Sequence, residues 1–216
     1  MTRPIPLSHR AYKKIKQMIV TLELPPGSVI DEAELQEALK MGRTPIREAL
    51  KRLALESLVS IVPRRGMFVT NIGVNDLQRL LEVRLDLETL ATRLAASRGT
   101  QEHWKRMEQL VVEPTTVGEV NYNSLIHLDE TFHEIIYEAA DNRFLHDAIT
   151  VLLTLNERLW YYFLPEMGGF QRTIDDHRLI WESLKSGDGE QAAAQMKRHI
   201  LSSQEKLHSV VLGDSP

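Results

Sequence analysis

The sequence predicts a mainly α-helical protein, with an N-terminal winged helix-turn-helix followed by an all-α helical bundle. Three amphipathic segments and then two short β-type runs across a tight turn occupy residues 1–70. Beyond them, residues 76–212 carry helical patterns with no strand pattern and no glycine-rich phosphate loop. We therefore expect a winged helix-turn-helix domain at 1–71 and a helical domain at 76–212, with a short polar break between them.

Charge is divided unevenly between these two segments. The 216 residues have a net charge of −4, but residues 1–70 hold 12 Lys and Arg against 7 Asp and Glu, and the remainder 14 against 23. A basic N-terminal segment indicates a polyanionic partner for that part alone. The chain has no cysteine, which excludes disulfides and thiolate metal sites. It has no apolar run of about 20 residues and no signal peptide, so we expect a cytoplasmic protein that does not enter a membrane.

The N-terminal helices follow from apolar spacing and capping residues. The stripe Ile15, Met18, Ile19 and Leu22 predicts a first helix over Ala11–Leu22, which Pro25 and Pro26 end. Asp31 is expected to cap a second helix, with Glu34 three residues later. In the third helix, we expect Thr44 as the N-cap residue and Pro45 as the first helical residue.

The third helix and the segment after it predict a DNA-binding surface. Its apolar residues face inward, whereas Arg47, Lys51 and Arg52 face outward. "LVSIV" and "MFVT" are then expected as strands joined across "PRRG". The start of such a helix enters the major groove, where arginine pairs with guanine or phosphate. Arg64 and Arg65 supply charge at the turn, and Gly66 permits close approach to the backbone. A solvated basic helix is the alternative for any single arginine, but the order of elements favours DNA binding.

Six helices are expected in the second domain: Asp76–Arg98, Gln101–Val112, Gly118–Ala140, Arg143–Leu164, Phe170–Lys185 and Gly189–Val211. Polar residues interrupt the apolar stripes of three of them. These residues are Asp129, His133, His177 and His199. Imidazoles with one carboxylate suit Zn²⁺, Ni²⁺ or Mn²⁺, and four ligands leave positions open on a six-coordinate ion. For each histidine alone, a hydrogen-bonded core residue is the more common interpretation.

Arg84 also lies within an apolar stripe, on the first helix of the second domain. A buried guanidinium needs an anion, and its planar fork suits a carboxylate. An internal salt bridge, to Glu88 or to an acid on a neighbouring helix, explains the position equally well.

The stretch "RTPIREALKRLALESLV…PRRGMFV" resembles the helix-and-wing signature of the GntR family of bacterial transcription regulators. The resemblance implies DNA contacts by Arg43, Thr44 and Arg47, with Gly66 at the wing. The family usually has Gly-Val-Ser before the first of these arginines, where this chain has Lys40, Met41 and Gly42. The usual serine phosphate contact is therefore missing, and Lys40 is a candidate to replace it.

"EVRLDLE", "LDETFHEIIYEAADN" and "DHRLIWESLKSGDGEQAAAQMKRHI" resemble the FCD effector domain of FadR-type GntR regulators. That resemblance implies a metal site formed by Asp129, His133, His177 and His199, and an effector contact by Arg84. Asn142 matches a recurrent asparagine, assigned here to effector binding, although Asp141 and Arg143 replace the usual Gly and Pro.

The sequence therefore predicts a ligand-responsive transcriptional regulator rather than an enzyme. We expect a homodimer on an inverted-repeat operator of double-stranded DNA, a divalent metal, and a small organic acid as effector. Repressors are the more common members of the resembled family. The predicted DNA-binding residues are Arg43, Thr44, Arg47, Lys51, Arg64, Arg65 and Gly66. One alternative keeps DNA binding with a purely structural metal; another is a metal-dependent hydrolase, for which the sequence offers no general base beyond the ligands.

Overall fold

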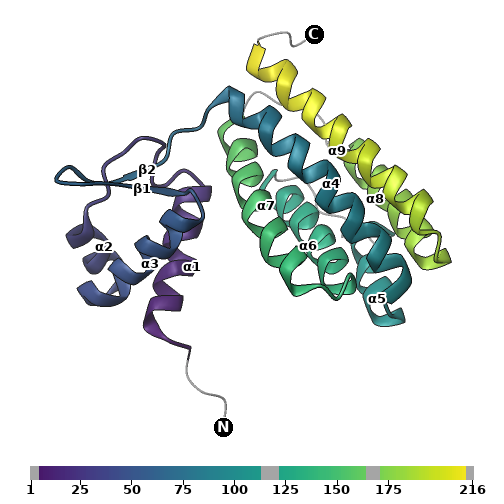
Figure 1. Ribbon diagram of the computed structural model, residues 1–216, viewed down its shortest axis with the longest axis horizontal. Helices are drawn as coiled ribbons and strands as arrows, with labels where there is room; N and C mark the ends of the chain where they lie inside the picture. Colours follow the sequence, from purple (N-terminus) through teal and green to yellow (C-terminus); the bar gives the residue numbers. More distant parts are fainter. Residues whose placement is uncertain (1–4, 113–121, 164–170, 213–216) are drawn as a thin grey trace. The chain divides into compact units, whose positions relative to one another are not determined.

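The computed structural model describes residues 5–112, 122–163 and 171–212. Within these ranges the chain forms nine helices and one two-stranded antiparallel sheet, in the order shown in Figure 1. The predicted mainly α-helical fold is confirmed. Contacts divide the chain into an N-terminal unit, Met1–Gly73 with Glu157–Tyr162, and a helical unit, Val74–Asn156 with Phe163–Pro216.

Three helices and a hairpin form the N-terminal unit: α1 (Leu7–Val20), α2 (Glu32–Leu39), α3 (Arg43–Leu55), β1 (Val59–Val62) and β2 (Gly66–Val69). The apolar faces of the helices meet in one core, formed by Ala11, Ile15, Ile19, Leu35, Ile46, Leu50 and Leu53. In the hairpin, Val59 pairs with Val69 and Val62 with Gly66. The backbone of β2 also bonds to the segment before α2, which joins the hairpin to the helices.

The helix ends differ in part from the sequence prediction. As predicted, Asp31 caps α2, because its carboxylate accepts from the backbone N–H groups of Ala33 and Glu34. Thr44 was expected to cap α3, and this is wrong: the helix begins at Arg43, with Gly42 as its N-cap residue. Lys40 adopts a left-handed conformation (φ 52°) that ends α2 and turns the chain within two residues. Consequently α3 begins earlier than the proline and threonine signals indicate.

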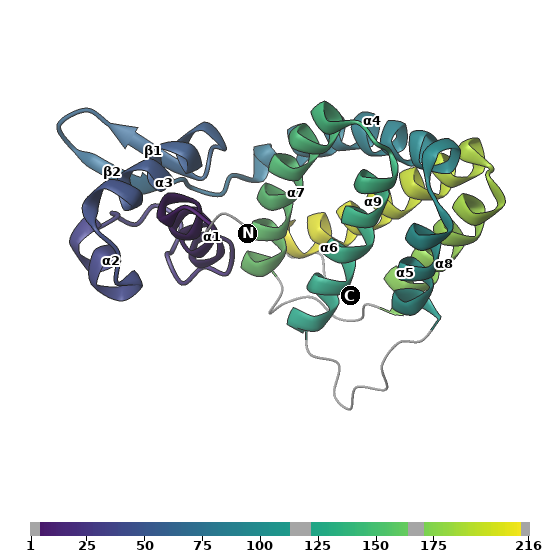
Figure 2. The same cartoon turned by 90° about the horizontal axis from the view of Figure 1, so that it is seen from below.

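The helical unit contains α4 (Val74–Arg98), α5 (Gln101–Val111), α6 (Tyr122–Ala139), α7 (Arg143–Phe163), α8 (Gln171–Ser186) and α9 (Gly189–Leu212). Helix α4 is central: it contacts α6, α8 and α9, and Figures 1 and 2 both show α9 running beside it. The core includes Phe132, Ile136, Ile180, Met196 and Ile200. Positions 118–121, 164 and 170 of the predicted helices lie outside the described residues.

The turn between α4 and α5 packs against Trp104 of α5, which is hydrogen-bonded to α8. Trp104 packs over Gly99, where an added Cβ would lie 2.3 Å from the indole ring and 2.7 Å from the carbonyl oxygen of Ala95. The backbone carbonyl of Trp104 in turn accepts a hydrogen bond from the indole of Trp181 on α8. A displacement of Trp104 would therefore also displace Trp181 and with it α8, the helix that carries His177.

We predict that Gly99→Ala destabilises the protein by about 1–3 kcal/mol, because the methyl group overlaps the Trp104 ring and an unyielding backbone carbonyl. Chemical denaturation followed by tryptophan fluorescence measures the change. Gly189→Ala is the matched control, since its Cβ would make only ordinary contacts of 3.4 Å or more, and we expect a change within about 0.5 kcal/mol. Equal losses for both variants would contradict the prediction.

Candidate functional site

Helix α3 presents its basic residues to solvent. Arg43, Thr44, Arg47 and Lys51 are all exposed, while the opposite face of the helix is buried. Both arginines lie close to one acid, Glu32 on α2: the distances from Nε to Oε2 are 3.5 Å for Arg43 and 3.4 Å for Arg47. Half-exposed ion pairs of this length are weak and readily exchanged for other anions. Glu32 therefore keeps the Arg43 and Arg47 side chains close together, but the weak ion pairs leave both free to bind another anion.

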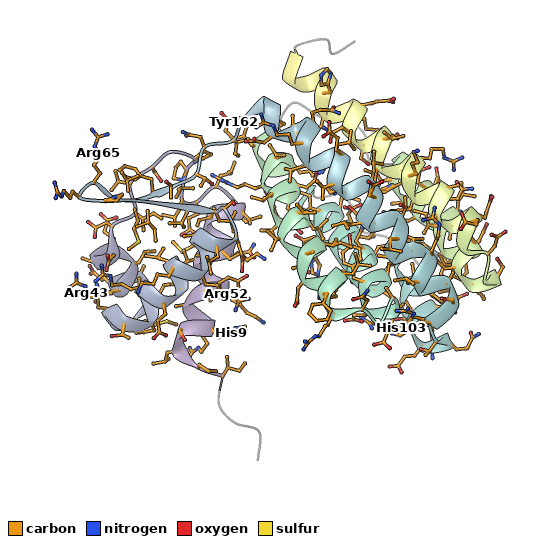
Figure 3. The ribbon with its side chains drawn as sticks, in the orientation of Figure 1. His9, Arg43, Arg52, Arg65, His103 and Tyr162 are labelled. Atoms are coloured by element: carbon orange, nitrogen blue, oxygen red, sulfur yellow. The ribbon has the colours of Figure 1, made fainter. Side chains whose placement is uncertain are left out.

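The hairpin turn carries the other predicted basic residues. Arg64 and Arg65 are exposed, and Figure 3 shows Arg65 and Arg43 both pointing outward from the N-terminal unit. Gly66 has φ 105°, a conformation that side chains rarely adopt, and nothing lies within 4 Å of its missing Cβ. Backbone and charge are thus both accessible at this turn, as contact with a phosphate requires.

Three helices of the helical unit bring the four predicted metal ligands together. Asp129 and His133 lie one turn apart on α6, His177 is on α8 and His199 is on α9. One ligand atom from each side chain falls within 4.8 Å of the others. Oδ1 of Asp129 lies 3.1 Å from Nε2 of His177, 3.6 Å from Nε2 of His199 and 3.9 Å from Nε2 of His133. Donors about 2.1 Å from an ion lie about 3–4 Å apart, so this cluster needs little movement to coordinate one.

The electrostatics of the cluster suit a cation. Burial opposes ionisation of Asp129, but the adjacent His133, His177 and His199 hold its pKa well below its usual range. Burial lowers the pKa of His177 to about 4, so its imidazole is neutral at pH 7. An ionised carboxylate beside a neutral imidazole is the donor state that divalent metals require.

Unsatisfied nitrogens support the same reading. Among the described residues, both ring nitrogens of His177 and Nδ1 of His199 are buried without a hydrogen-bond partner. Although Nε2 of His177 lies near Asp129, the contact lacks hydrogen-bond geometry. Core histidines that serve only packing normally find such partners, because an unsatisfied buried polar atom is costly. The donor set therefore fits a resident metal ion.

Arg84 forms an internal salt bridge with Glu88, one of the two alternatives that the sequence allowed for this residue. Its Nε donates to Oε1 of Glu88 at 2.6 Å, and both side chains are buried. Between described residues, the Arg84 side chain makes its hydrogen bond through Nε and not through Nη1 or Nη2. Burial opposes ionisation of Glu88, but Arg84 and His133 lower its pKa to about 2. The guanidinium is therefore anchored at one nitrogen and keeps two others for an anion.

Asn142 has a local structural contact instead. Its side-chain oxygen accepts from the backbone N–H of Leu145 at 3.3 Å, at the start of α7. This is a helix-capping contact. The effector-binding role predicted for Asn142 remains untested.

Two residues at this site were not predicted to take part. The sequence indicates Glu88 only as a salt-bridge partner of Arg84, and no motif in it points to Tyr137. The hydroxyl of Tyr137 donates to Oε2 of Glu88 at 2.8 Å, and Nδ1 of His133 lies 2.8 Å from the same oxygen. Each lies four residues from a predicted site residue, Arg84 or His133. This four-residue spacing is the one feature of the sequence that could have indicated Glu88 and Tyr137, and it is too common in helices to single them out.

Comparison with known families assigns both units. Residues 7–69 match the model of the bacterial regulatory proteins of the gntR family, and residues 79–202 match the FCD domain. The chain belongs to the GntR family. It is a DNA-binding transcriptional regulator with an FCD domain, as the sequence motifs predicted.

Named relatives of this GntR regulator are similar over most of their length. The Nta operon transcriptional regulator of Aminobacter aminovorans is 28% identical, over 91% of this chain and 92% of that protein. The HTH-type transcriptional repressor RspR of Escherichia coli K12 is 25% identical, over 95% and 90%. The solved structure of E. coli McbR/YncC has a TM-score of 0.84 at 22% identity, over 95% and 98%, which shows a shared fold.

Neither matching family model is that of an enzyme, and the curated relatives named here are transcriptional regulators. Of the helices in the described ranges, none is both long enough and apolar enough to cross a membrane.

We predict that Arg84→Met lowers the free energy of unfolding of this GntR regulator by about 3 kcal/mol, because it removes one partner of a buried ion pair. This value is at the low end of the loss of stability usual for breaking a buried ion pair, because Tyr137 and His133 still face Glu88. Arg79→Met on the same helix is the control, because the Arg79 side chain is 76% exposed and its loss should cost less than about 0.5 kcal/mol. Urea unfolding of both variants gives the two values, and a loss below 1 kcal/mol for Arg84→Met would refute a strong buried pair.

Proposed function

We propose that this GntR regulator is a metal-dependent sensor of a small organic acid. Residues 1–71 would read an inverted-repeat operator and residues 76–212 would bind the ligand, in a homodimer that acts in the cytoplasm as a repressor. The observation that carries the proposal is the cluster of Asp129, His133, His177 and His199, with donor atoms within 4.8 Å of one another. Zn²⁺, Ni²⁺ and Mn²⁺ all accept this donor set.

The effector part of the proposal rests on Arg84. Four protein ligands leave open positions on a six-coordinate ion, and a carboxylate is a good ligand for such positions. Because Glu88 holds Arg84 by Nε, the terminal nitrogens are available to the same carboxylate. An acid bound by ion and arginine together would favour one arrangement of α4, α6, α8 and α9, and so change DNA affinity, provided its affinity differs between two states.

An apolar row on α4 supports the proposed homodimer. Leu80, Val83, Leu87, Leu90 and Leu94 repeat at alternating spacings of three and four residues, as in a helix–helix seam. Val83 is 46% exposed and Leu90 is 41% exposed. Leu87 and Leu94 also pack against the core of the chain itself, so a second copy about a two-fold axis would chiefly cover Val83 and Leu90, and a two-fold dimer reads a palindromic operator.

The repressor assignment follows the commoner behaviour of the family, and RspR is a named repressor among the relatives.

The metal site is tested by elemental analysis of wild-type protein and of His133→Ala/His177→Ala. We expect one ion per wild-type chain and less than a tenth of that in the variant. In parallel, thermal shifts against a panel of small organic acids should show stabilisation of wild type only. A metal-stripped protein that melts earlier, when no acid shifts the wild type, would favour a structural metal. Turnover of acids or their esters would favour a hydrolase, and a metal-free wild type would leave the histidines as core residues.

The DNA interface is tested with an operator selected from random duplexes. We expect Arg43→Ala and Arg47→Ala each to weaken operator binding by about 1–3 kcal/mol with relaxed base preference, as loss of a base contact does. Arg65→Ala should instead weaken all duplexes alike and reduce the salt dependence by about one unit. Arg106→Ala, at an exposed ion pair with Glu138 in the helical unit, is the control. Binding is measured by fluorescence anisotropy. If Arg43→Ala, Arg47→Ala and Arg65→Ala all bind DNA as the Arg106→Ala control does, the assignment of these arginines to the DNA interface is contradicted.

A further inference from the structure

The carboxylate of Glu88 is the most enclosed acidic group of the helical unit among the described residues, with no exposed surface. Three donors from two helices face it. Arg84, from the same helix, reaches Oε1, while Tyr137 and His133 of α6 both reach Oε2. A fully buried carboxylate is stable as an anion only with such donors around it. Glu88 is therefore a fixed negative charge between Arg84 and the proposed metal cluster.

The contact with Glu88 decides which nitrogen of His133 carries a proton. Nδ1 of His133 lies 2.8 Å from Oε2 of Glu88 and 3.2 Å from the hydroxyl of Tyr137. A lone pair at that distance from an anionic oxygen would be repelled, so Nδ1 must carry the hydrogen. In the neutral ring, which is the form that binds a metal, Nε2 then keeps its lone pair, and it lies 3.3 Å from Nε2 of His199, inside the cluster. Imidazoles that bind metals through Nε2 need this tautomer.

The other two histidines lack such support. His199 has Asp176 nearest to its Nδ1, but at 3.9 Å, beyond hydrogen-bond distance. Nδ1 of His177 has no hydrogen-bond partner among the described residues, and its ring is held by stacking on Phe132, with centroids 4.0 Å apart. Among the three histidines of the cluster, His133 is thus the one whose Nδ1 lies within hydrogen-bond distance of a described carboxylate.

We propose that Glu88 is a positioning residue for the metal centre: it holds His133 in the metal-binding tautomer while it anchors Arg84. This inference rests on the proposed metal site. It adds that metal affinity depends on a residue that is not a ligand, and that the ion and the arginine share one carboxylate. An anion that draws Arg84 away from Glu88 would therefore change the hydrogen bonding of a metal ligand.

A simpler account makes Glu88 only the counter-ion of Arg84. That account explains the contact of Oε1, but it does not require Oε2 to face His133 and Tyr137. The two accounts differ in what happens to metal affinity when the charge of Glu88 is removed.

Glu88→Gln separates them, because glutamine keeps the shape and replaces one oxygen by an NH₂ donor. Because Nε of Arg84 is always a donor, the amide oxygen takes the Oε1 position and the NH₂ group faces His133. Nδ1 must then become an acceptor and the proton moves to Nε2, where it blocks coordination. We expect the Kd for Ni²⁺, measured by calorimetry on metal-stripped full-length protein, to rise about 10–100-fold. Asp86→Asn is the matched control: it removes the same charge from an exposed position two residues earlier on α4 and should leave the Kd unchanged.

A second readout needs no metal. Long-range ¹H–¹⁵N NMR spectra of the histidine rings, recorded at a pH high enough for His133 to be neutral, report the tautomer, and we expect His133 to change from Nδ1–H in wild type to Nε2–H in Glu88→Gln. If Glu88→Gln does not fold, Glu88→Asp takes its place. It keeps the charge but draws the carboxylate one methylene away from Nδ1 of His133, and it should raise the Kd several-fold without altering the number of ions bound.

The outcomes distinguish this inference from the proposed function. A wild-type chain that binds no Ni²⁺ overturns the metal site and the inference with it. A wild-type chain that binds Ni²⁺, with an unchanged Kd in folded Glu88→Gln or Glu88→Asp, overturns the inference alone and leaves Glu88 as a counter-ion. A raised Kd in Glu88→Gln with an unchanged Kd in Asp86→Asn supports it.

Discussion

One fully buried carboxylate, Glu88, and one partly buried carboxylate, Asp129, organise the helical unit, because an acid shielded from water must be surrounded by donors or lose its charge. Glu88 of α4 is met by Arg84 from its own helix and by Tyr137 and His133 from α6. Asp129 of α6 is met by His177 of α8 and His199 of α9. Four helices thus converge on two adjacent negative charges, and His133 is common to both.

The N-terminal unit uses charge in the opposite way. Its arginines lie at the surface, where water screens them, and Glu32 holds Arg43 and Arg47 only by half-exposed contacts. A polyanion can replace such a partner at little cost, whereas the buried pairs of the helical unit cannot exchange without leaving a charge unpaired. The same residue types therefore suit reversible contact with DNA in one unit and a preorganised site in the other.

Much of this arrangement could be predicted from the sequence, because amphipathic spacing shows which helix faces are buried. The stripes of three helices placed Asp129, His133, His177 and His199 on inward faces, and Asp31 was recognised as a cap from its position. The start of α3 was placed wrongly, since Thr44 and Pro45 are strong local signals that the left-handed turn at Lys40 overrides. Glu88 was seen only as one of several acids within reach of Arg84.

By itself the sequence determined the element order, the family and the set of inward polar residues, all of which depend on local spacing and motif. Tertiary structure alone decided which of those residues touch. Residues four apart on a helix always share a face, but whether Glu88 meets His133, 45 positions away, depends on how α4 and α6 are rotated against each other. That rotation is set by the packing of the whole core, and it determines which nitrogen of a histidine is left for a metal.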